Sequence, residues 1–188
     1  MLKTIEEYSK YVAIAGFKNA RIGSTEEFLH AIRSEQSENV DIQLFDAEKV
    51  AGWQHLYFAA LNALTAFKSK VNISKSLEME TMLYASSQRQ IRRAMGLLGI
   101  NPDTSAVAVL VIGEKAEDVK SALSHVSKHV NAQRDDGVLE LTNEKVTVIR
   151  KIFGISDVEL ETVMKNGGLE NALTDLVIEW MALLATQH

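Results

Sequence analysis

The chain of 188 residues contains no cysteine and only one proline. The absence of cysteine excludes disulfides and thiolate chemistry, which fits a reducing, cytoplasmic environment. Because no tract is rich in proline, glycine or serine, no linker is evident and we expect one domain over residues 1–188. No apolar run reaches 18 residues, so the sequence predicts no contact with the membrane interior, and the N-terminal apolar run is too short for a signal peptide.

Motifs for catalysis and nucleotide binding are also missing. The sequence has no G-x-G-x-x-G, no Walker A loop and no G-x-S-x-G. His125 and His129 stand four residues apart, a spacing found in metal sites, but no third ligand is evident and a partly exposed helical pair is the better interpretation. His55, beside Trp53 and Tyr57, is interpreted as a packed histidine. We therefore expect no enzymatic activity, no cofactor and no metal.

The apolar pattern predicts an α+β fold, with seven or eight helices packed on a small mixed β-sheet. Strands are expected at 11–17, 40–45 and 106–112, with a short edge strand at 138–141. Helices are expected after Ser24, between Asp46 and Phe67, after Ser74 or Ser76, after Ser87, over 117–130 and 143–153, after Ser156 and over 169–185.

Several helix ends are predicted from capping residues. Asp46 is expected to be the N-cap of the long second helix, and Asn143 the cap of a later one. Gly99 and Gly154 are expected to end helices in the left-handed conformation. Capping boxes are expected at Ser24 and Glu27, Ser87 and Gln90, and Ser156 and Glu159.

Positive charge is concentrated in one stretch of an acidic chain, whose formal net charge is −5. Residues 68–93 carry six basic and two acidic side chains, net +4, whereas residues 1–67 sum to −3 and residues 94–188 to −6. Such a protein is no general nucleic-acid binder, because neutralising phosphates needs a cationic surface. A local basic patch can still hold a short strand. The alternative, a solvated helix face, is the one that composition alone favours.

The turn of residues 85–90 lies inside this basic stretch. A helix N-terminus there would offer free backbone amides, with Arg89, Arg92 and Arg93 close by, and such an arrangement binds phosphate or an exposed nucleotide. The same residues are equally explained by helix capping and surface charge. From the residues alone, both interpretations remain open.

The sequence resembles a known family from about Val40 onward. FDAEKVAGWQHL, the ALNAL helix, ISKSLEMETMLYASSQRQI, LLGI and NEKVTVIRKIFGI are similar to the kinase-binding subunit of the KEOPS complex, in the archaeal branch of the TPRKB family. YASSQRQI is the most specific segment, although the family often has glycine at the position of Ser87. The part up to Gly23 matches only loosely.

The resemblance implies a function. KEOPS transfers a threonylcarbamoyl group to the tRNA adenosine beside the anticodon, and other subunits carry out the chemistry. The subunit that this chain resembles is non-catalytic, docks on the small atypical kinase/ATPase subunit and helps it, and is thought to bind the single-stranded 3′ CCA end of tRNA. Three unpaired bases and a few phosphates suit a small basic patch.

Carried over to this sequence, the resemblance implies a set of RNA-binding candidates. They are Lys68, Lys70, Asn72, Ile73, Lys75, Ser87, Gln88, Arg89 and Gln90. Arg92 and Arg93 are weaker candidates, because their role depends on which helix face is free. For the kinase, the candidates are Trp180, Met181 and Leu184 on the last helix, or the edge of the long helix near Trp53.

Three hypotheses from different classes follow, in order of preference. The first is a non-catalytic subunit that binds tRNA and the kinase. The second is a protein adaptor for the kinase that does not bind RNA. The third is a small-molecule enzyme with an unrecognised site around His55.

Overall fold

The structure is a computed structural model that describes residues 1–34, 39–130, 132–164 and 168–186. The chain forms two compact units, each built from two segments. Residues 1–47 and 99–138 form a sheet unit, and residues 48–98 and 139–188 form a helical unit. The expectation of one domain over residues 1–188 stays a prediction, and each unit is described by itself.

The sheet unit is organised around one central strand. Its strands are β1 (Leu2–Ile5), β2 (Lys10–Lys18), β3 (Val40–Asp46), β4 (Ala106–Gly113) and β5 (Gln133–Arg134). They are ordered β1-β2-β4-β3, with β5 pairing with β2. The α+β class is confirmed, but the sheet is antiparallel in every described pairing rather than mixed. All eight residues of β4 are buried, as expected for the apolar run at 106–112.

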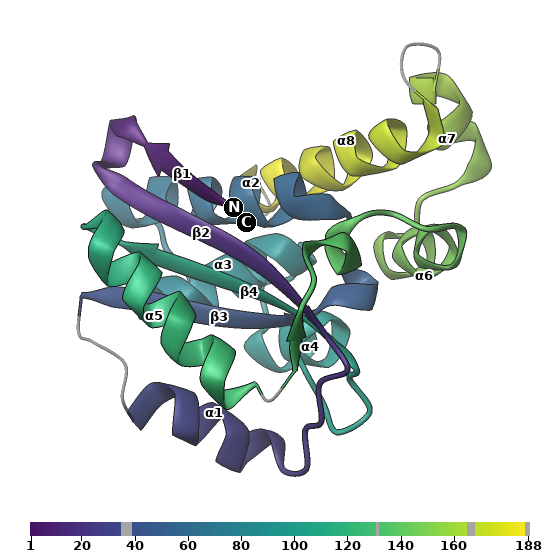
Figure 1. The fold of residues 1–188 in the computed structure, drawn as a ribbon. Coiled ribbons are helices and arrows are strands. Elements are labelled where there is room, and N and C mark those ends of the chain that lie inside the picture. Colours follow the sequence, from purple (N-terminus) through teal and green to yellow (C-terminus); the bar gives the residue numbers. More distant parts are fainter. Residues whose placement is uncertain (35–38, 131, 165–167, 187–188) are drawn as a thin grey trace. The chain divides into compact units, whose positions relative to one another are not determined.

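One face of the sheet carries the core of this unit. Helix α5 (Ala116–His129) packs on β2, β3 and β4, and α1 (Thr25–Ser34) packs on α5 (Figure 1). Val119, Val126 and Ile32 come from these helices into the core. The strand residues of the same cluster include Ala13, Ala15 and Phe17 on β2 and Val107, Val109 and Val111 on β4.

A tight loop closes over β2 at Gly16. The Asp135 N–H donates to the Gly16 carbonyl at 2.9 Å, and the Gly16 N–H donates to Asp136 Oδ1, also at 2.9 Å. The edge strand expected at 138–141 is wrong, because a short 3₁₀ helix, Asp136–Leu139, occupies this part of the chain. The strand that does pair with β2 is the two-residue β5 just before it.

The helical unit has six α-helices among its described residues. They are α2 (Gly52–Lys68), α3 (Leu77–Ser86), α4 (Ile91–Leu98), α6 (Asn143–Phe153), α7 (Asp157–Val163) and α8 (Gly168–Leu183). Helix α8 contacts α2, α3, α6 and α7. A core of Ile149, Leu160, Leu173, Leu176 and Val177 joins α6, α7 and α8.

The helix ends test the capping predictions. The Ser156–Glu159 box is confirmed, and the Ser24 hydroxyl accepts from the Glu27 N–H. Gly154 ends α6 with φ of +67°, as predicted, whereas α6 is capped by Thr142 rather than by Asn143.

The caps predicted at Asp46 and Gly99 are also wrong. Asp46 is the last residue of β3, and a 3₁₀ turn (Ala47–Lys49) separates it from α2, whose N-cap is Ala51. Gly99 follows α4 without the left-handed backbone that was predicted.

A bilayer-spanning helix would need more length and apolarity than any helix in the described ranges has.

Replacing Gly16 by alanine is expected to destabilise the protein. The added Cβ would lie 2.5 Å from the Asp135 carbonyl oxygen and 2.6 Å from Val138 Cγ2, so backbone must shift. We expect the free energy of unfolding to fall by about 1–3 kcal/mol in urea denaturation. Gly23→Ala is the control, because nothing lies within 4 Å of its Cβ position. Equal stability of the two variants would contradict the prediction.

Candidate functional site

The first half of the predicted RNA-binding set lies where α2 turns into α3. Helix α2 ends in a Schellman motif, in which the Lys70 N–H donates to the Phe67 carbonyl and the Val71 N–H to the Ala66 carbonyl, at 3.2 and 3.0 Å. Lys70 occupies the left-handed position with φ of +57°, where glycine is usual. The motif fixes where the chain leaves the helix, and the Lys70 side chain lies exposed at this corner.

The carboxylate of Glu80 holds the connection between the two helices. Glu80 is fully buried, and its oxygens accept the backbone N–H groups of Ile73 at 3.0 and 3.1 Å and of Ser74 at 2.6 Å. Asn72 Nδ2 donates to the Ser74 carbonyl at 2.8 Å. These backbone amides are therefore used within the protein, which leaves the exposed side chains of Ile73 and Lys75 as the groups available to a ligand.

The second half of the set lies in the turn between α3 and α4. The Ser87 N–H donates to the Tyr84 carbonyl at 2.9 Å and the Gln88 N–H to the Leu83 carbonyl at 3.0 Å, a second Schellman motif. Ser87 has φ of +52°, again in the left-handed region. Among the described residues its buried hydroxyl oxygen has no hydrogen-bond partner.

The capping box predicted at Ser87 and Gln90 is therefore wrong. Ser87 ends α3 instead of beginning α4, because its backbone closes the preceding helix. The first turn of α4 is closed by the Gln90 carbonyl, which accepts the Arg93 and Ala94 N–H groups at 3.0 and 2.9 Å.

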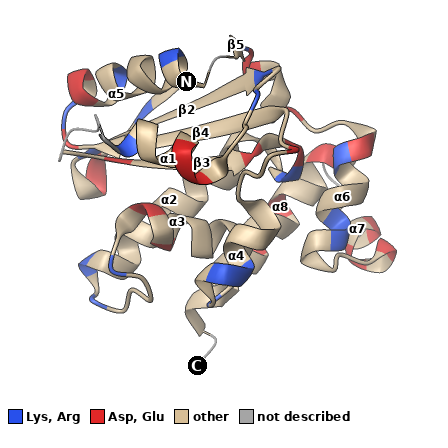
Figure 2. Cartoon of the chain, turned by 90° about the horizontal axis from the view of Figure 1, so that it is seen from below, with Lys and Arg blue, Asp and Glu red and all other residues tan. Residues whose placement is uncertain are grey.

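The structure brings the members of each half together but separates the two halves. They lie at opposite ends of α3, and ten helical residues span about 15 Å. Figure 2 shows basic segments at the α2–α3 connection and on α4. Exposed Lys68, Lys70 and Lys75 mark the first position, and exposed Arg89 and Gln90 the second, with Arg92 and Arg93 also exposed on α4. A ligand that uses both halves must extend along α3.

Exposed apolar side chains lie among these basic residues. Val71 is 67% exposed, Ile73 37% and Ile91 46%. Only Ile73 of these was among the sequence candidates, although a valine between lysines and an isoleucine beside arginines is visible in the sequence. Tyr84, the aromatic residue of this stretch, is buried. Burial and then the negative charge of Glu80 raise its pKa, and the charge of Arg89 opposes the rise.

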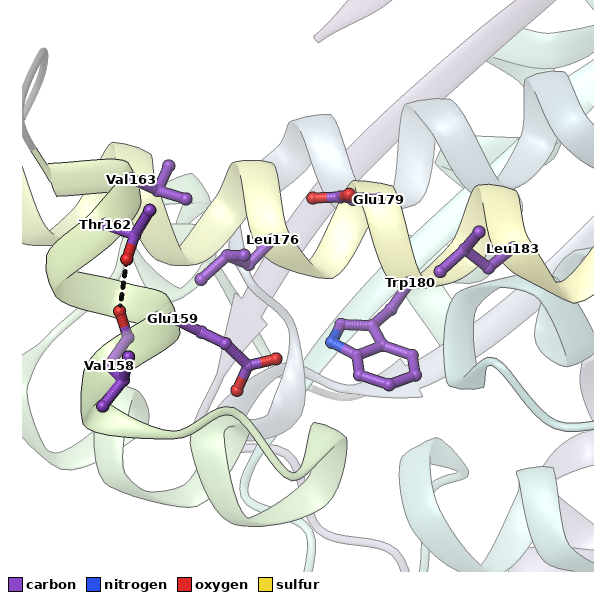
Figure 3. Close-up of a pocket in the computed structure, with 8 residues that line it drawn as sticks. All are labelled: Val158, Glu159, Thr162, Val163, Leu176, Glu179, Trp180 and Leu183. Atoms are coloured by element: carbon purple, nitrogen blue, oxygen red, sulfur yellow. Dashed lines mark hydrogen bonds between the residues drawn. The ribbon is translucent and has the colours of Figure 1, made fainter.

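Of the residues of α8 predicted to contact the kinase, two are buried and one is partly exposed. Met181 and Leu184 are fully buried, so neither offers a surface to a partner, because the apolar face of α8 points into the core. Trp180 is only partly buried and lines a groove between α7 and α8 with a volume of about 350 Å³. We call this the α7–α8 groove, lined among others by Val158, Glu159, Leu176, Glu179, Trp180 and Leu183 (Figure 3). Trp53, the alternative position, is partly buried on α2 against Tyr57.

His55 is a structural residue of the helical unit. Its Nδ1 accepts the Ala51 N–H at 3.1 Å, so the ring proton lies on Nε2, which donates to the Ala85 carbonyl at 2.8 Å. The ring is 0% exposed and packs edge-on against Phe153. The pKa of His55 is lowered to about 4, because burial outweighs the hydrogen bond to Ala85, which raises it, and the charge of nearby Lys145 adds a smaller lowering. With both nitrogens engaged, the ring is not available for chemistry.

The His125–His129 pair lies on α5 with ring centroids 4.2 Å apart. His129 Nδ1 lies 3.0 Å from the His125 carbonyl, so this nitrogen is used by the helix backbone. In the ranges that the structure describes, no cluster of three or more His, Asp or Glu side chains is arranged to hold a metal.

Comparison with known proteins identifies the family. A family model described as "Kinase binding protein CGI-121" matches residues 17–185. The "Regulatory protein Cgi121" of Methanocaldococcus jannaschii is 33% identical over 113 residues, which are 60% of this chain and 70% of the relative. The chain therefore belongs to the CGI-121 family of kinase-binding proteins, as its sequence resemblance predicted.

The stability of the protein should depend on the protonation of His55. Its pKa is about 4 in the folded protein, against 6.5 for an unperturbed histidine, so the unfolded chain binds more protons between these pH values. His55 therefore contributes stability that is fully present above pH 6.5 and is lost as the pH falls toward 4, by about 3 kcal/mol. Urea unfolding across this range should show a shallower pH slope for His55→Gln than for the wild type. The exposed His30→Gln is the control, and equal slopes for wild type and His55→Gln would contradict the assignment.

Replacing Ser87 by glycine is expected to stabilise the protein by about 1 kcal/mol. The left-handed backbone costs an L-residue roughly 1–2 kcal/mol, and part of this gain is offset by the greater freedom of glycine in the unfolded chain. The neighbouring Ser86→Gly is the control and is expected to destabilise the protein, because Ser86 is helical and its hydroxyl donates to the Met82 carbonyl. Thermal unfolding of both variants checks this, and destabilisation by Ser87→Gly would contradict it.

Proposed function

We propose that this chain is a non-catalytic regulatory subunit of a KEOPS tRNA-modification complex, which binds the kinase/ATPase subunit and the 3′ CCA end of tRNA. Membership of a kinase-binding family supports the first partner. The observation that carries the second is the surface of residues 68–93, with a net charge of +4 in a chain of net charge −5. No reaction is assigned to this chain itself.

The chemistry of the surface suits a short unpaired strand. Lysine and arginine side chains neutralise phosphates, and the exposed Val71, Ile73 and Ile91 offer apolar contacts to base faces. Since Tyr84 is buried, bases would stack on arginine planes and aliphatic side chains rather than on an aromatic platform. The spacing of about 15 Å along α3 favours several linked nucleotides over a single one.

The rigidity of the surface also supports this function. Two Schellman motifs and the Glu80 carboxylate fix the backbone from which the candidate side chains project. A preorganised site loses little conformational entropy when it binds a flexible strand. The acidic remainder of the chain repels duplex RNA, which restricts binding to an end that reaches the basic surface.

The alternative is a kinase adaptor that does not bind RNA. In that case residues 68–93 form a solvated surface, and the exposed apolar side chains have no ligand. The two functions differ in one measurable property, which is affinity for tRNA at physiological salt.

Binding of the purified chain to intact tRNA and to tRNA without its 3′ CCA end, at two salt concentrations, tests the proposal. We expect trimming to weaken binding about tenfold or more, and affinity to fall as salt rises because phosphates release counterions. Arg89→Glu should weaken binding of intact tRNA by a similar factor. Lys120→Glu, the same charge reversal at an exposed position of α5, is the matched control.

Equal affinity for intact and trimmed tRNA would contradict the CCA assignment. If the chain does not bind tRNA at physiological salt, the alternative function, a kinase adaptor that does not bind RNA, is supported instead. If Arg89→Glu is folded by circular dichroism and binds tRNA with normal affinity, residues 87–90 are not part of the site. The α2–α3 connection would then remain as the proposed tRNA-binding surface.

A further inference from the structure

The α7–α8 groove combines an apolar floor with an acidic rim. Leu176 and Trp180 form part of its lining, and Val158 and Leu183 lie at its walls with 73% and 44% of their surface exposed. Such exposed aliphatic residues beside a partly buried tryptophan are typical of a protein-binding surface. Glu159 and Glu179 line the same groove.

Figure 3 shows how these side chains lie. The indole of Trp180 projects from α8 into the space facing α7, with the ring nitrogen on the side of Glu159. Among the described residues, no hydrogen-bond partner for this nitrogen is found. Tryptophan in this position offers both a flat apolar surface and one N–H donor to an incoming group.

The charge around the groove is predominantly negative, although Asp157 is paired with Arg150. Residues 157–186 contain six acidic residues and one lysine, which sums to −5 and equals the net charge of the whole chain. The Glu159 carboxylate is held by the Ser156 N–H and hydroxyl, at 2.8 and 2.6 Å, and these hydrogen bonds lower its pKa. A fixed negative charge therefore lies at the α7 wall, and the exposed Glu179 lies on α8.

We infer that the α7–α8 groove receives a segment of the kinase that carries an apolar side chain flanked by lysine or arginine. The apolar side chain packs on Trp180 and Leu176, and the flanking cations face Glu159 and Glu179. This inference rests on the proposed function, because the partner is the proposed kinase, and it adds the surface and the chemistry of the segment that occupies it. Charge complementarity selects a basic segment, since acidic or neutral ones gain nothing from the rim.

Two other occupants have chemistry that fits the groove, and the first of them is an outcome of the test. The basic stretch 68–93 of a second copy has apolar residues among its lysines and arginines, so a homodimer is one. A small apolar cation is the other, because the volume of about 350 Å³ lies in the range of ligand pockets. A kinase segment is favoured over the small ligand because the groove is open at exposed Val158 and Leu183, which a small molecule would leave in water.

The test measures binding of the purified KEOPS kinase to surface variants of the full chain. Glu179→Arg and Leu183→Glu change exposed groove residues, and each should weaken kinase binding about tenfold or more. Glu161→Arg and Val148→Glu are the matched controls, because both residues are exposed, belong to the same unit and do not line the groove. The controls should change affinity less than about twofold. Thermal unfolding checks that all four variants are folded.

A charge-swap experiment then identifies the segment. Reversing one lysine or arginine of the kinase to glutamate should weaken binding to the wild type and restore binding to Glu179→Arg. The pair of residues that shows this reciprocal effect defines the contact. If no lysine or arginine beside an exposed apolar residue of the kinase shows the effect, the charge argument is overturned.

The remaining outcomes separate the inference from the function on which it rests. If the wild type binds the kinase and the groove variants bind equally well, the groove is not the docking surface and the proposed function stands. If the wild type does not bind the kinase, the proposed function and the inference fall together. A concentration-dependent dimer that Glu179→Arg abolishes, seen by sedimentation without kinase, would overturn the inference in favour of a second copy.

Discussion

The helical unit depends on the neutral imidazole of His55. Only a neutral ring can accept from Ala51 and donate to Ala85 at the same time, and full burial keeps it neutral. The Ala51 carbonyl in turn accepts from the Thr174 hydroxyl, so His55 and Ala51 together link the start of α2, the end of α3 and the first turns of α8. Both proposed surfaces follow from these positions, because Ser87 comes two residues after Ala85 and Trp180 lies on α8 beyond Thr174. A displaced imidazole would therefore disturb both.

Two of the four described non-glycine residues with a left-handed backbone lie at the proposed RNA surface. Lys70 and Ser87, one at each end of α3, hold the left-handed conformation that glycine adopts without cost. Both close Schellman motifs, so the surrounding hydrogen bonds impose the conformation. Strained residues of this kind persist only where the surrounding structure over-determines their conformation. A lysine at the first corner adds a charge that glycine cannot supply, whereas Ser87 has a buried hydroxyl whose benefit nothing in the structure explains.

The sequence predicted which helices and strands form better than it predicted where they begin and end. The apolar run of β4 and the Ser156–Glu159 box are local patterns, and the structure confirms them. The strand expected at 40–45 is also present, but its alternating polar residues did not reveal that six of the seven residues of β3 are buried. Asp46 and Gln90 failed because a cap depends on where the chain turns, which contacts distant in sequence decide. His55, four residues into α2, fixes the Ala51 N–H at the start of that helix. Glu80 was counted only as one of the two acidic residues of 68–93, since no sequence signal distinguishes a buried carboxylate from an exposed one. The RNA assignment came from family resemblance rather than from any of these patterns.

The two proposed surfaces have opposite charge, and this separation has a consequence for specificity. Residues 68–93 sum to +4 and residues 157–186 to −5 within one helical unit. An RNA strand is attracted by the first and repelled by the second, whereas a basic protein segment experiences the reverse. Like-charge repulsion rejects a wrong partner without any dedicated contact, and at physiological salt it acts within about 8 Å of the surface. A chain of modest net charge can in this way present two binding surfaces that do not compete for the same ligand, which neither the composition nor the net charge of −5 reveals.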